Sequence, residues 1–273
     1  IGSGLVGSEM CIRDRYLQFA KDVAYKAGEI MLKYFKEDNR ASYKGDKTIV
    51  TLADKEINTY LIDQVKQKFP THSVDGEEEQ FGKSNHVWVC DPVDGTAMYA
   101  RHIPVAVFSL ALVIDGISTV GVVYDPFTNN LYSAIKGKGT YKNGKKIIVN
   151  DYQLDDMRSV SNFDMWPRAD YNIYDVIKKL GEKTYFVSIG SVIRGGMCVA
   201  DGEFNMAIFP GTKRKNCDIA AVKVIVEEAG GKVTDIFGNE QRYDQDINGA
   251  IISNGLVHDE VVKMINEFLN KKH

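Results

Sequence analysis

Val87-Trp88-Val89-Cys90-Asp91-Pro92-Val93-Asp94-Gly95-Thr96 is a stretch in which an apolar run ends at two carboxylates and a hydroxyl. The β-branched and aromatic residues up to Cys90 predict a buried strand, and Pro92 cannot donate to a strand ladder, so we expect the strand to leave the sheet at Asp91. Carboxylates and a nearby main-chain carbonyl, here that of Val93, are ligands of Mg²⁺ or Mn²⁺. The N–H groups of Gly95 and Thr96 would lie where a helix starts and could hold phosphate. The stretch therefore predicts a metal-assisted phosphate site.

Other interpretations of this stretch lead elsewhere. Asp, Pro, Gly and Thr are common in turns, so an ordinary loop is possible. The aspartyl-phosphate phosphatase motif D-x-D-G-T does not fit, because its two acids are separated by one residue and Asp91 and Asp94 are separated by two. The stretch instead resembles the D-P-[IL]-D-G-T signature of the inositol monophosphatase family of Mg²⁺-dependent phosphatases.

The composition is that of an ordinary globular protein. The 273 residues are 44% hydrophobic and 26% charged with a net charge of −3, so the chain has no overall positive field to attract nucleic acid or an anionic membrane. No apolar run reaches the roughly 20 residues that span a bilayer. Four scattered cysteines, without a C-x-x-C pair, suggest neither a zinc site nor a disulfide framework. We predict a cytoplasmic protein with reduced thiols.

Residues 1–15 differ from the rest of the chain. They lack the basic start and long apolar core of a signal peptide and show no clean helical or strand period. We therefore predict that they are a non-native leader. The pattern becomes regular from Leu17 and changes again between residues 157 and 167. We predict an N-terminal α+β half over residues 16–156, which carries the metal and phosphate site, and a C-terminal α/β half over residues 157–273.

Hydrophobic periodicity predicts the elements of both halves. In the first half, one helix runs from Leu17 toward Asp38, a second ends at Pro70, and strands are expected at 108–114, 119–124, 131–135 and 147–149. Short turns favour antiparallel pairing, with the two helices on one face of the sheet. In the second half, strands at 185–188, 204–209 and 250–252 alternate with helices at 171–180, 192–199, 219–229 and 257–269. The fold class is therefore α+β, with an antiparallel-rich N-terminal sheet and an α/β C-terminal half.

Two more acids precede the opening stretch. Thr51-x-x-Asp54 fits a capping box, in which Asp54 stabilises a helix N-terminus. Val50-Thr51-Leu52-Ala53-Asp54 also resembles the family's V-T-x-x-D element, whose aspartate lies beside the metal and helps to orient the attacking water. Gly76-Glu77-Glu78-Glu79 has the composition of a solvated turn, but it resembles the family's G-E-E element, whose first Glu binds metal. Both roles stay open for Asp54, and the resemblance makes Glu77 a metal ligand.

Asp218 begins a pattern far along the chain, D-x-A-A…E-A-G-G. As the start of a helix it would be stabilised by the helix macrodipole, and it also resembles the metal-binding Asp of the family's second signature. The resemblance covers the chain from about Leu17 and implies a layered α-β-α-β-α sandwich. It implies two or three Mg²⁺ ions, with Mn²⁺ possible, held by Glu77, Asp91, the Val93 carbonyl, Asp94 and Asp218.

The resemblance also implies the chemistry. A metal-activated water would hydrolyse a small phosphate monoester, with Asp54, Thr96 and Glu77 in catalysis and the phosphate on the amides of Gly95 and Thr96. Thr96, paired with Asp54, would orient or deprotonate that water. Candidate substrate contacts are Asp94, Gly190, Ser191, Lys215 and Asp218. Inositol monophosphate or a related sugar or polyol phosphate is the expected substrate, and fructose 1,6-bisphosphate and histidinol phosphate are alternatives. Lithium inhibition and a homodimer are also implied.

Four residues depart from the family pattern. Met98 stands in place of Asn, Cys217 in place of Trp, and Gly211 near the place of an inositol-contacting Glu, while Ala97 lacks the Lys of the adenosine-bisphosphate branch. Lys213-Arg214-Lys215 could bind a second anionic group or be a solvated loop. A catalytically weak homologue that binds a phosphorylated metabolite is a further alternative. A metal-dependent deacylase or aldolase is disfavoured because the chain has no histidine ligand cluster.

Overall fold

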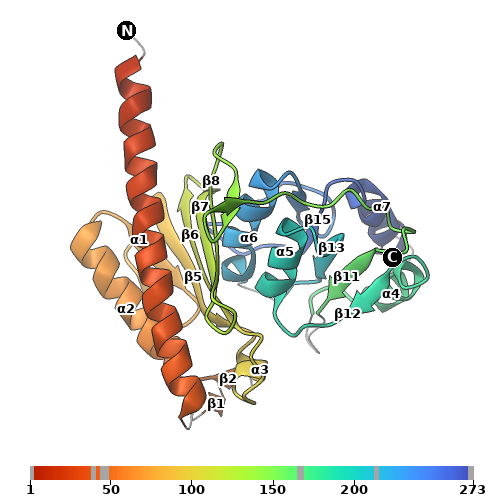
Figure 1. The fold of residues 1–273 in the computed structure, drawn as a ribbon, viewed down its shortest axis with the longest axis horizontal. Coiled ribbons are helices and arrows are strands. Elements are labelled where there is room, and N and C mark those ends of the chain that lie inside the picture. The colour runs from red at the N-terminus through yellow and green to blue at the C-terminus, as the bar shows by residue number, and fades with distance from the viewer. Residues whose placement is uncertain (1–2, 38–40, 44–48, 165–168, 212–214, 270–273) are drawn as a thin grey trace.

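The computed structural model describes residues 3–37, 41–43, 49–164, 169–211 and 215–269, and their side chains from residue 12 onward except that of Tyr43. Its elements stack in five layers (Figure 1). Helices α1 and α2 cover one face of a large sheet, α5 and α6 lie between that sheet and a smaller one, and α4 and α7 cover the far face. This arrangement confirms the predicted α-β-α-β-α sandwich. Among the described residues, no helix combines the length and apolarity that a membrane crossing requires.

The large sheet comes from the first half of the chain. Its strand order in the described residues is β10-β9-β8-β7-β6-β5-β3-β4, and every neighbouring pair is antiparallel except β3 with β5. The strands are β3 (Ser73–Gly76), β4 (Gln80–Phe81), β5 (His86–Asp94), β6 (Val107–Ile114), β7 (Ile117–Asp125), β8 (Asn130–Ile135), β9 (Thr140–Lys142) and β10 (Lys145–Lys146). A separate antiparallel pair joins β1 (Ser42–Tyr43) to β2 (Ile49–Val50).

The expectation that the chain leaves the sheet at Asp91 is wrong. Strand β5 continues to Asp94, and its pairing with β6 shifts register between Asp91, opposite Ser109, and Asp94, opposite Val107. Pro92 lies inside this irregularity, where the ladder does not need its missing N–H. The bulge therefore carries both acids on the strand itself.

The two faces of β5 bury into different layers. Trp88 and Cys90 belong to the core that includes α1 (Ser3–Lys36) and α2 (Leu52–Lys68), whereas Val87 and Val89 belong to the core around α6. This alternation follows from the two-residue period of a strand. Since both faces are covered by helices, the strand is apolar throughout and ends at its acids in the protein interior.

Helix α1 begins earlier than predicted. It starts at Ser3 instead of Leu17 and ends at Lys36, and the predicted end at Asp38 and Asn39 lies outside the described residues. Asp14 forms an exposed ion pair of 2.6 Å with Lys138, a contact of a kind that contributes little to stability. Residues 3–15 thus continue the same helix, and their assignment as a non-native leader stays a prediction.

The smaller sheet comes from the second half. Its order is β12-β11-β13-β15-β14, with β11 parallel to both neighbours and β15 antiparallel to both of its own. The strands are β11 (Val160–Phe163), β12 (Tyr185–Val187), β13 (Met206–Phe209), β14 (Lys232–Thr234) and β15 (Ala250–Ser253), and the helices are α4 (Tyr174–Leu180), α5 (Val192–Ala200), α6 (Asn216–Glu228) and α7 (His258–Leu269).

Near the predicted junction of the two halves, the structure has one strand that was not expected and lacks one that was expected. Strand β11 lies in the stretch that we took as a boundary. It was not predicted because polar Ser161 and Asn162 weaken its apolar pattern. Ser161 is nevertheless buried, where its hydroxyl forms a hydrogen bond with Thr184. No strand forms at 147–149, since this segment crosses between the sheets, with Ile148 exposed and the Val149 N–H donating to Ala229 O at 3.0 Å. The division at residue 157 stays a prediction.

Candidate active site

Acids from three distant segments converge at the end of β5. Strand β3 runs parallel to β5 with Gly76 opposite Cys90, so Glu77 emerges beside Asp91, and its N–H donates to Cys90 O at 3.1 Å. Asp218 lies in the first turn of α6. A carboxylate oxygen of Asp91, a carboxylate oxygen of Asp218 and the sulfur of Cys217 all lie within 4.8 Å of one another. The predicted signatures therefore meet in space.

Asp94 connects this cluster to α5. Its Oδ2 accepts hydrogen bonds from the Ser191 hydroxyl and from the Ile193 N–H, the latter at 2.9 Å. Burial raises the pKa of Asp94 to about 7, with the nearby charge of Asp218 adding to the rise and the bonds from Ser191 and Ile193 opposing it. The Asp94 carboxylate is thus held at a helix N-terminus, which favours its charged form.

Lys215 lies among the acids. Its Nζ is 2.8 Å from Glu77 Oε1 and 3.9 Å from Asp218 Oδ1. Burial alone would lower the pKa of Lys215, but the carboxylates of Asp218 and Glu77 outweigh it and raise that pKa well above its usual value. Burial, followed by the charges of Glu77, Asp94 and Asp218, raises the pKa of Asp91 well above its usual range. One ammonium therefore offsets only part of the charge that these four acids can carry.

The acidic set fits a hard divalent cation. Its donors are carboxylate oxygens and the Val93 carbonyl, and both Asp91 and Asp94 are buried. Buried, mutually repelling carboxylates are costly unless they are protonated or paired with a cation. The chemistry of the donor set thus agrees with the predicted ligands Glu77, Asp91, Val93, Asp94 and Asp218, whose metal roles stay a prediction.

Asp54 occupies the capping position considered for it, and its role beside a metal stays a prediction. Its Oδ2 accepts the N–H of Thr51 at 2.7 Å and also the Thr51 hydroxyl, which confirms the capping box at the start of α2. Its Oδ1 is buried and has no hydrogen-bond partner among the described residues. Burial raises the pKa of Asp54 to about 7, with contributions from Glu77 and Glu78. An unsatisfied acceptor beside an acidic cluster is a feature that a bound water could satisfy.

The predicted phosphate and substrate residues lie together. Gly95 has a φ of 88°, and a Cβ built there would lie 3.1 Å from Gly190 O, so only glycine suits this close approach between α3 (Thr96–Tyr99) and the start of α5. The Thr96 hydroxyl donates to the Val93 carbonyl at 2.8 Å, so its one proton goes there and not to Asp54. Met98 packs against Gly190, which places this departure beside the expected substrate loop.

Sequence reasoning missed Asp164, which supports that loop. Its carboxylate accepts the Ser188 hydroxyl at 2.6 Å and the Gly190 N–H at 2.8 Å. Asp164 directly follows β11, just as Asp91 follows the apolar run of β5. Recognition of β11 in the sequence would therefore have revealed Asp164 as a candidate. Gly211 lies beside Gly249 and Asp170, and Lys213 and Arg214 lie outside the described residues.

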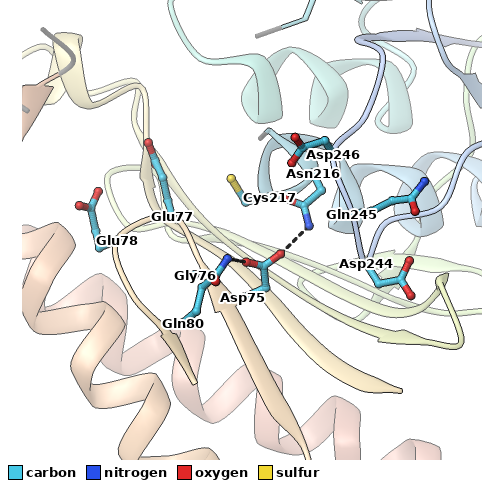
Figure 2. Close-up of a pocket in the computed structure, with 10 residues that line it drawn as sticks. All are labelled: Asp75, Gly76, Glu77, Glu78, Gln80, Asn216, Cys217, Asp244, Gln245 and Asp246. Carbon is cyan, nitrogen blue, oxygen red and sulfur yellow. Dashed lines mark hydrogen bonds between the residues drawn. The ribbon is translucent and has the colours of Figure 1, made fainter. Parts of the chain in front are cut away.

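A cavity of about 650 Å³ adjoins the cluster through Glu77 and Cys217 (Figure 2). Asp91, Asp94 and Thr96 are not among its lining residues, so the cavity lies next to the predicted site and does not contain it. Figure 2 shows Asp75 between Gln80 and Asn216, both of which donate hydrogen bonds to it. The remaining lining residues are Gly76, Glu78, Asp244, Gln245 and Asp246.

Comparison with known proteins shows similarity over nearly the whole chain. Residues 13–269 match the inositol monophosphatase family. A Thermotoga maritima fructose-1,6-bisphosphatase/inositol-1-monophosphatase is 33% identical over 93% of this chain and 97% of the relative. A solved Thermotoga maritima IMPase superposes with a TM-score of 0.83 at 31% identity, covering 94% of this chain and 99% of that one. A solved IMPase/NADP phosphatase complexed with Mg²⁺ and phosphate gives a TM-score of 0.79 at 26% identity, covering 94% and 95%. The chain belongs to the inositol monophosphatase family.

Proposed function

We propose that the protein hydrolyses a small phosphate monoester, most favourably inositol monophosphate or a related sugar or polyol phosphate, in a Mg²⁺-dependent reaction. Membership of the family supports phosphatase activity on phosphate esters. The observation that carries the finer proposal is the convergence of Asp91 and Asp218 oxygens within 4.8 Å, with Glu77 and Asp94 beside them.

The chain offers separate groups for cation, phosphate and water. Glu77, Asp91, the Val93 carbonyl, Asp94 and Asp218 would hold two or three Mg²⁺ ions, with Mn²⁺ as a substitute. When bound, such ions lower the pKa of water and neutralise charge on phosphoryl oxygens. The relative complexed with Mg²⁺ and phosphate supports this assignment.

The remaining roles belong to this chain's own residues. The Gly95 and Thr96 amides would donate to phosphate oxygens and stabilise their negative charge. Asp54 Oδ1, buried and without a partner among the described residues, would accept the proton of the attacking water. The Thr96 hydroxyl, fixed by the Val93 carbonyl at 2.8 Å, would orient that water through its oxygen lone pairs. Gly190, Ser191, Lys215, Asp94 and Asp218 would contact the substrate, and Asp164 would hold the Gly190 loop in place.

The same site suits other phosphate esters. The Thermotoga maritima relative is named for both fructose 1,6-bisphosphate and inositol 1-phosphate, which supports fructose 1,6-bisphosphate as an alternative. Histidinol phosphate is a further alternative. A catalytically weak homologue that only binds a phosphorylated metabolite would keep the fold and lose turnover. We also propose a cytoplasmic homodimer inhibited by Li⁺.

A phosphate-release screen over inositol, sugar and histidinol phosphates, with and without Mg²⁺, tests the proposal. Asp91→Asn should lower turnover by at least about a hundredfold, because it removes a charged donor from the cluster. Asp115→Asn is the matched control, since Asp115 is exposed and Asn tolerates its φ of 52°. Near-normal turnover in Asp91→Asn, or Mg²⁺-independent hydrolysis, would contradict the proposed function.

A further inference from the structure

Cys217 brings a sulfur atom into a cluster of oxygen donors. Its Sγ lies within 4.8 Å of ligand atoms of Asp91 and Asp218, and it is 3.6 Å from Asp218 Oδ1. The corresponding position in the resembling family pattern carries Trp, which offers no metal ligand. All three residues are buried. The chain thus contains a mixed set of two carboxylates and one thiol at its expected metal site.

We propose that Cys217, Asp91 and Asp218 bind a thiophilic divalent cation such as Zn²⁺ or Cd²⁺. Sulfur ligands select soft and borderline cations, whereas oxygen ligands alone favour Mg²⁺. Tetrahedral zinc has bonds of about 2.0–2.3 Å, which separate its ligand atoms by about 3.5 Å. The Cys217 sulfur and Asp218 Oδ1 already have this spacing, at 3.6 Å. The three ligand atoms lie within 4.8 Å of one another, so side-chain rotations that shorten the longer separations by about 1 Å would bring all three to the zinc spacing. The thiol proton passes to solvent as the sulfur–metal bond forms.

The cavity beside Cys217 supplies a second observation. Its lining includes five carboxylate side chains, those of Asp75, Glu77, Glu78, Asp244 and Asp246, together with Cys217. Arg242 pairs with Asp244 and Lys215 pairs with Glu77, so these two acids are partly neutralised. The excess of acids favours cations over anions in this cavity. Figure 2 shows the Cys217 side chain among these residues, so a cation drawn into the cavity would reach the sulfur.

The inference extends the proposed function, because it uses the same carboxylates, but its test does not depend on hydrolysis. Chelator-treated protein, kept reduced, is titrated with CdCl₂ in excess Mg²⁺ while the ultraviolet sulfur-to-cadmium charge-transfer band is followed. The wild type and Cys198→Ser should both show the band saturating near one equivalent. Cys198 lies in α5 and is outside the cluster, so its replacement removes a thiol without changing the site.

Cys217→Ser should lose the band and bind Cd²⁺ at least about tenfold more weakly, since serine keeps the size of the side chain but not its soft donor. An unchanged band in this variant would overturn the inference. The double variant Cys11→Ser/Cys198→Ser retains Cys217, and absence of the band there would overturn it even if Cys217→Ser failed to fold. If the wild type shows the cadmium band but releases no phosphate in the Mg²⁺-dependent screen, only the proposed function is refuted. If it releases phosphate in that screen but shows no cadmium band, only this inference is refuted.

Discussion

Replacing Lys215 by Gln should lower the melting temperature of the metal-free protein and increase the stabilisation that Mg²⁺ gives. The Lys215 ammonium is 2.8 Å from Glu77 and 3.9 Å from Asp218. In the pair with Glu77, the lysine side chain is 24% exposed and the glutamate side chain is 16% exposed. Removing one partner of a buried pair costs about 3–5 kcal/mol, and the partial exposure places this pair near the lower value. For a chain of 273 residues, about 3 kcal/mol corresponds to a fall of roughly 5 °C in melting temperature.

The response to Mg²⁺ should change in the opposite direction. A cation held by Glu77 and Asp218 is repelled by the ammonium that already pairs with them, and unit charges 4 Å apart interact by about 4 kcal/mol at an effective dielectric constant of 20. We therefore expect Lys215→Gln to bind Mg²⁺ at least about tenfold more tightly, equivalent to about 1.4 kcal/mol of additional stabilisation at saturating ion.

Thermal melts of chelated protein over a Mg²⁺ series measure both effects. Lys223→Gln is the matched control, because Lys223 is a buried ammonium paired at 2.7 Å with Glu227 and with Glu240, outside the cluster. This control should lower the melting temperature while leaving the Mg²⁺-dependent rise as in the wild type. If Lys215→Gln gained no more from Mg²⁺ than Lys223→Gln, the argument that Lys215 and metal compete for the same carboxylates would be refuted.

Three other substitutions test separate parts of the structure. Thr96→Val removes the hydroxyl that donates to Val93 and should reduce phosphate release by about 10²–10⁴-fold with a smaller change in melting temperature, as assayed by release kinetics beside a melt. Folding raises the pKa of Asp54 from 3.8 to about 7, so its protonated carboxyl contributes fully to stability below pH 4, and this contribution is lost as pH rises through 7. The free energy of unfolding of Asp54→Asn, relative to that of the wild type, should therefore rise by up to about 4 kcal/mol between pH 4 and pH 8 in urea titrations with chelator. A difference that does not change with pH would contradict this. Gly121→Ala places a Cβ 2.5 Å from Val224 Cγ1, where β7 meets α6, and should lower the urea midpoint by the equivalent of about 1–3 kcal/mol.

The sequence allowed most elements to be predicted because they carry their own hydrophobic period, whereas the layered arrangement was implied by the family resemblance. Strands β6, β7 and β8 and helices α5, α6 and α7 lie within a few residues of their expected ranges. The exceptions have local causes. Pro92 suggested that the sheet ended at Asp91, but tertiary packing on both faces of β5 carries the strand through a bulge to Asp94. Polar Ser161 and Asn162 hid β11, because their hydrogen bonds to Thr184 and Ile189 join residues distant in sequence and cannot be inferred from periodicity.

The acids of the candidate site could be selected from the sequence because each lies in a recognisable motif, although their metal roles stay a prediction. Glu77 follows β3, Asp91 and Asp94 lie in the last four residues of β5, and Asp218 lies in the first turn of α6. Such places near the ends of elements commonly hold functional side chains. The interactions among them were not predictable in the same way. The pairing of Lys215 with Glu77 joins residues 138 positions apart, and the inclusion of Cys217 depends on how α6 is set against β5. Residue identity indicated what could bind, and only the packing of the two sheets determined which groups meet.

The start of α6 explains why metal binding and stability should be coupled in this protein. The helix macrodipole favours a charged Asp218 by about 0.3–1 kcal/mol, whereas burying an unpaired carboxylate costs several kcal/mol. The dipole is therefore too weak to compensate the cluster, and Lys215 at the helix N-cap supplies one positive charge against four acids. The rest must come from protons or cations. Since protons and cations compete for the same oxygens, a change that removes either one shifts the affinity for the other and the free energy of unfolding together.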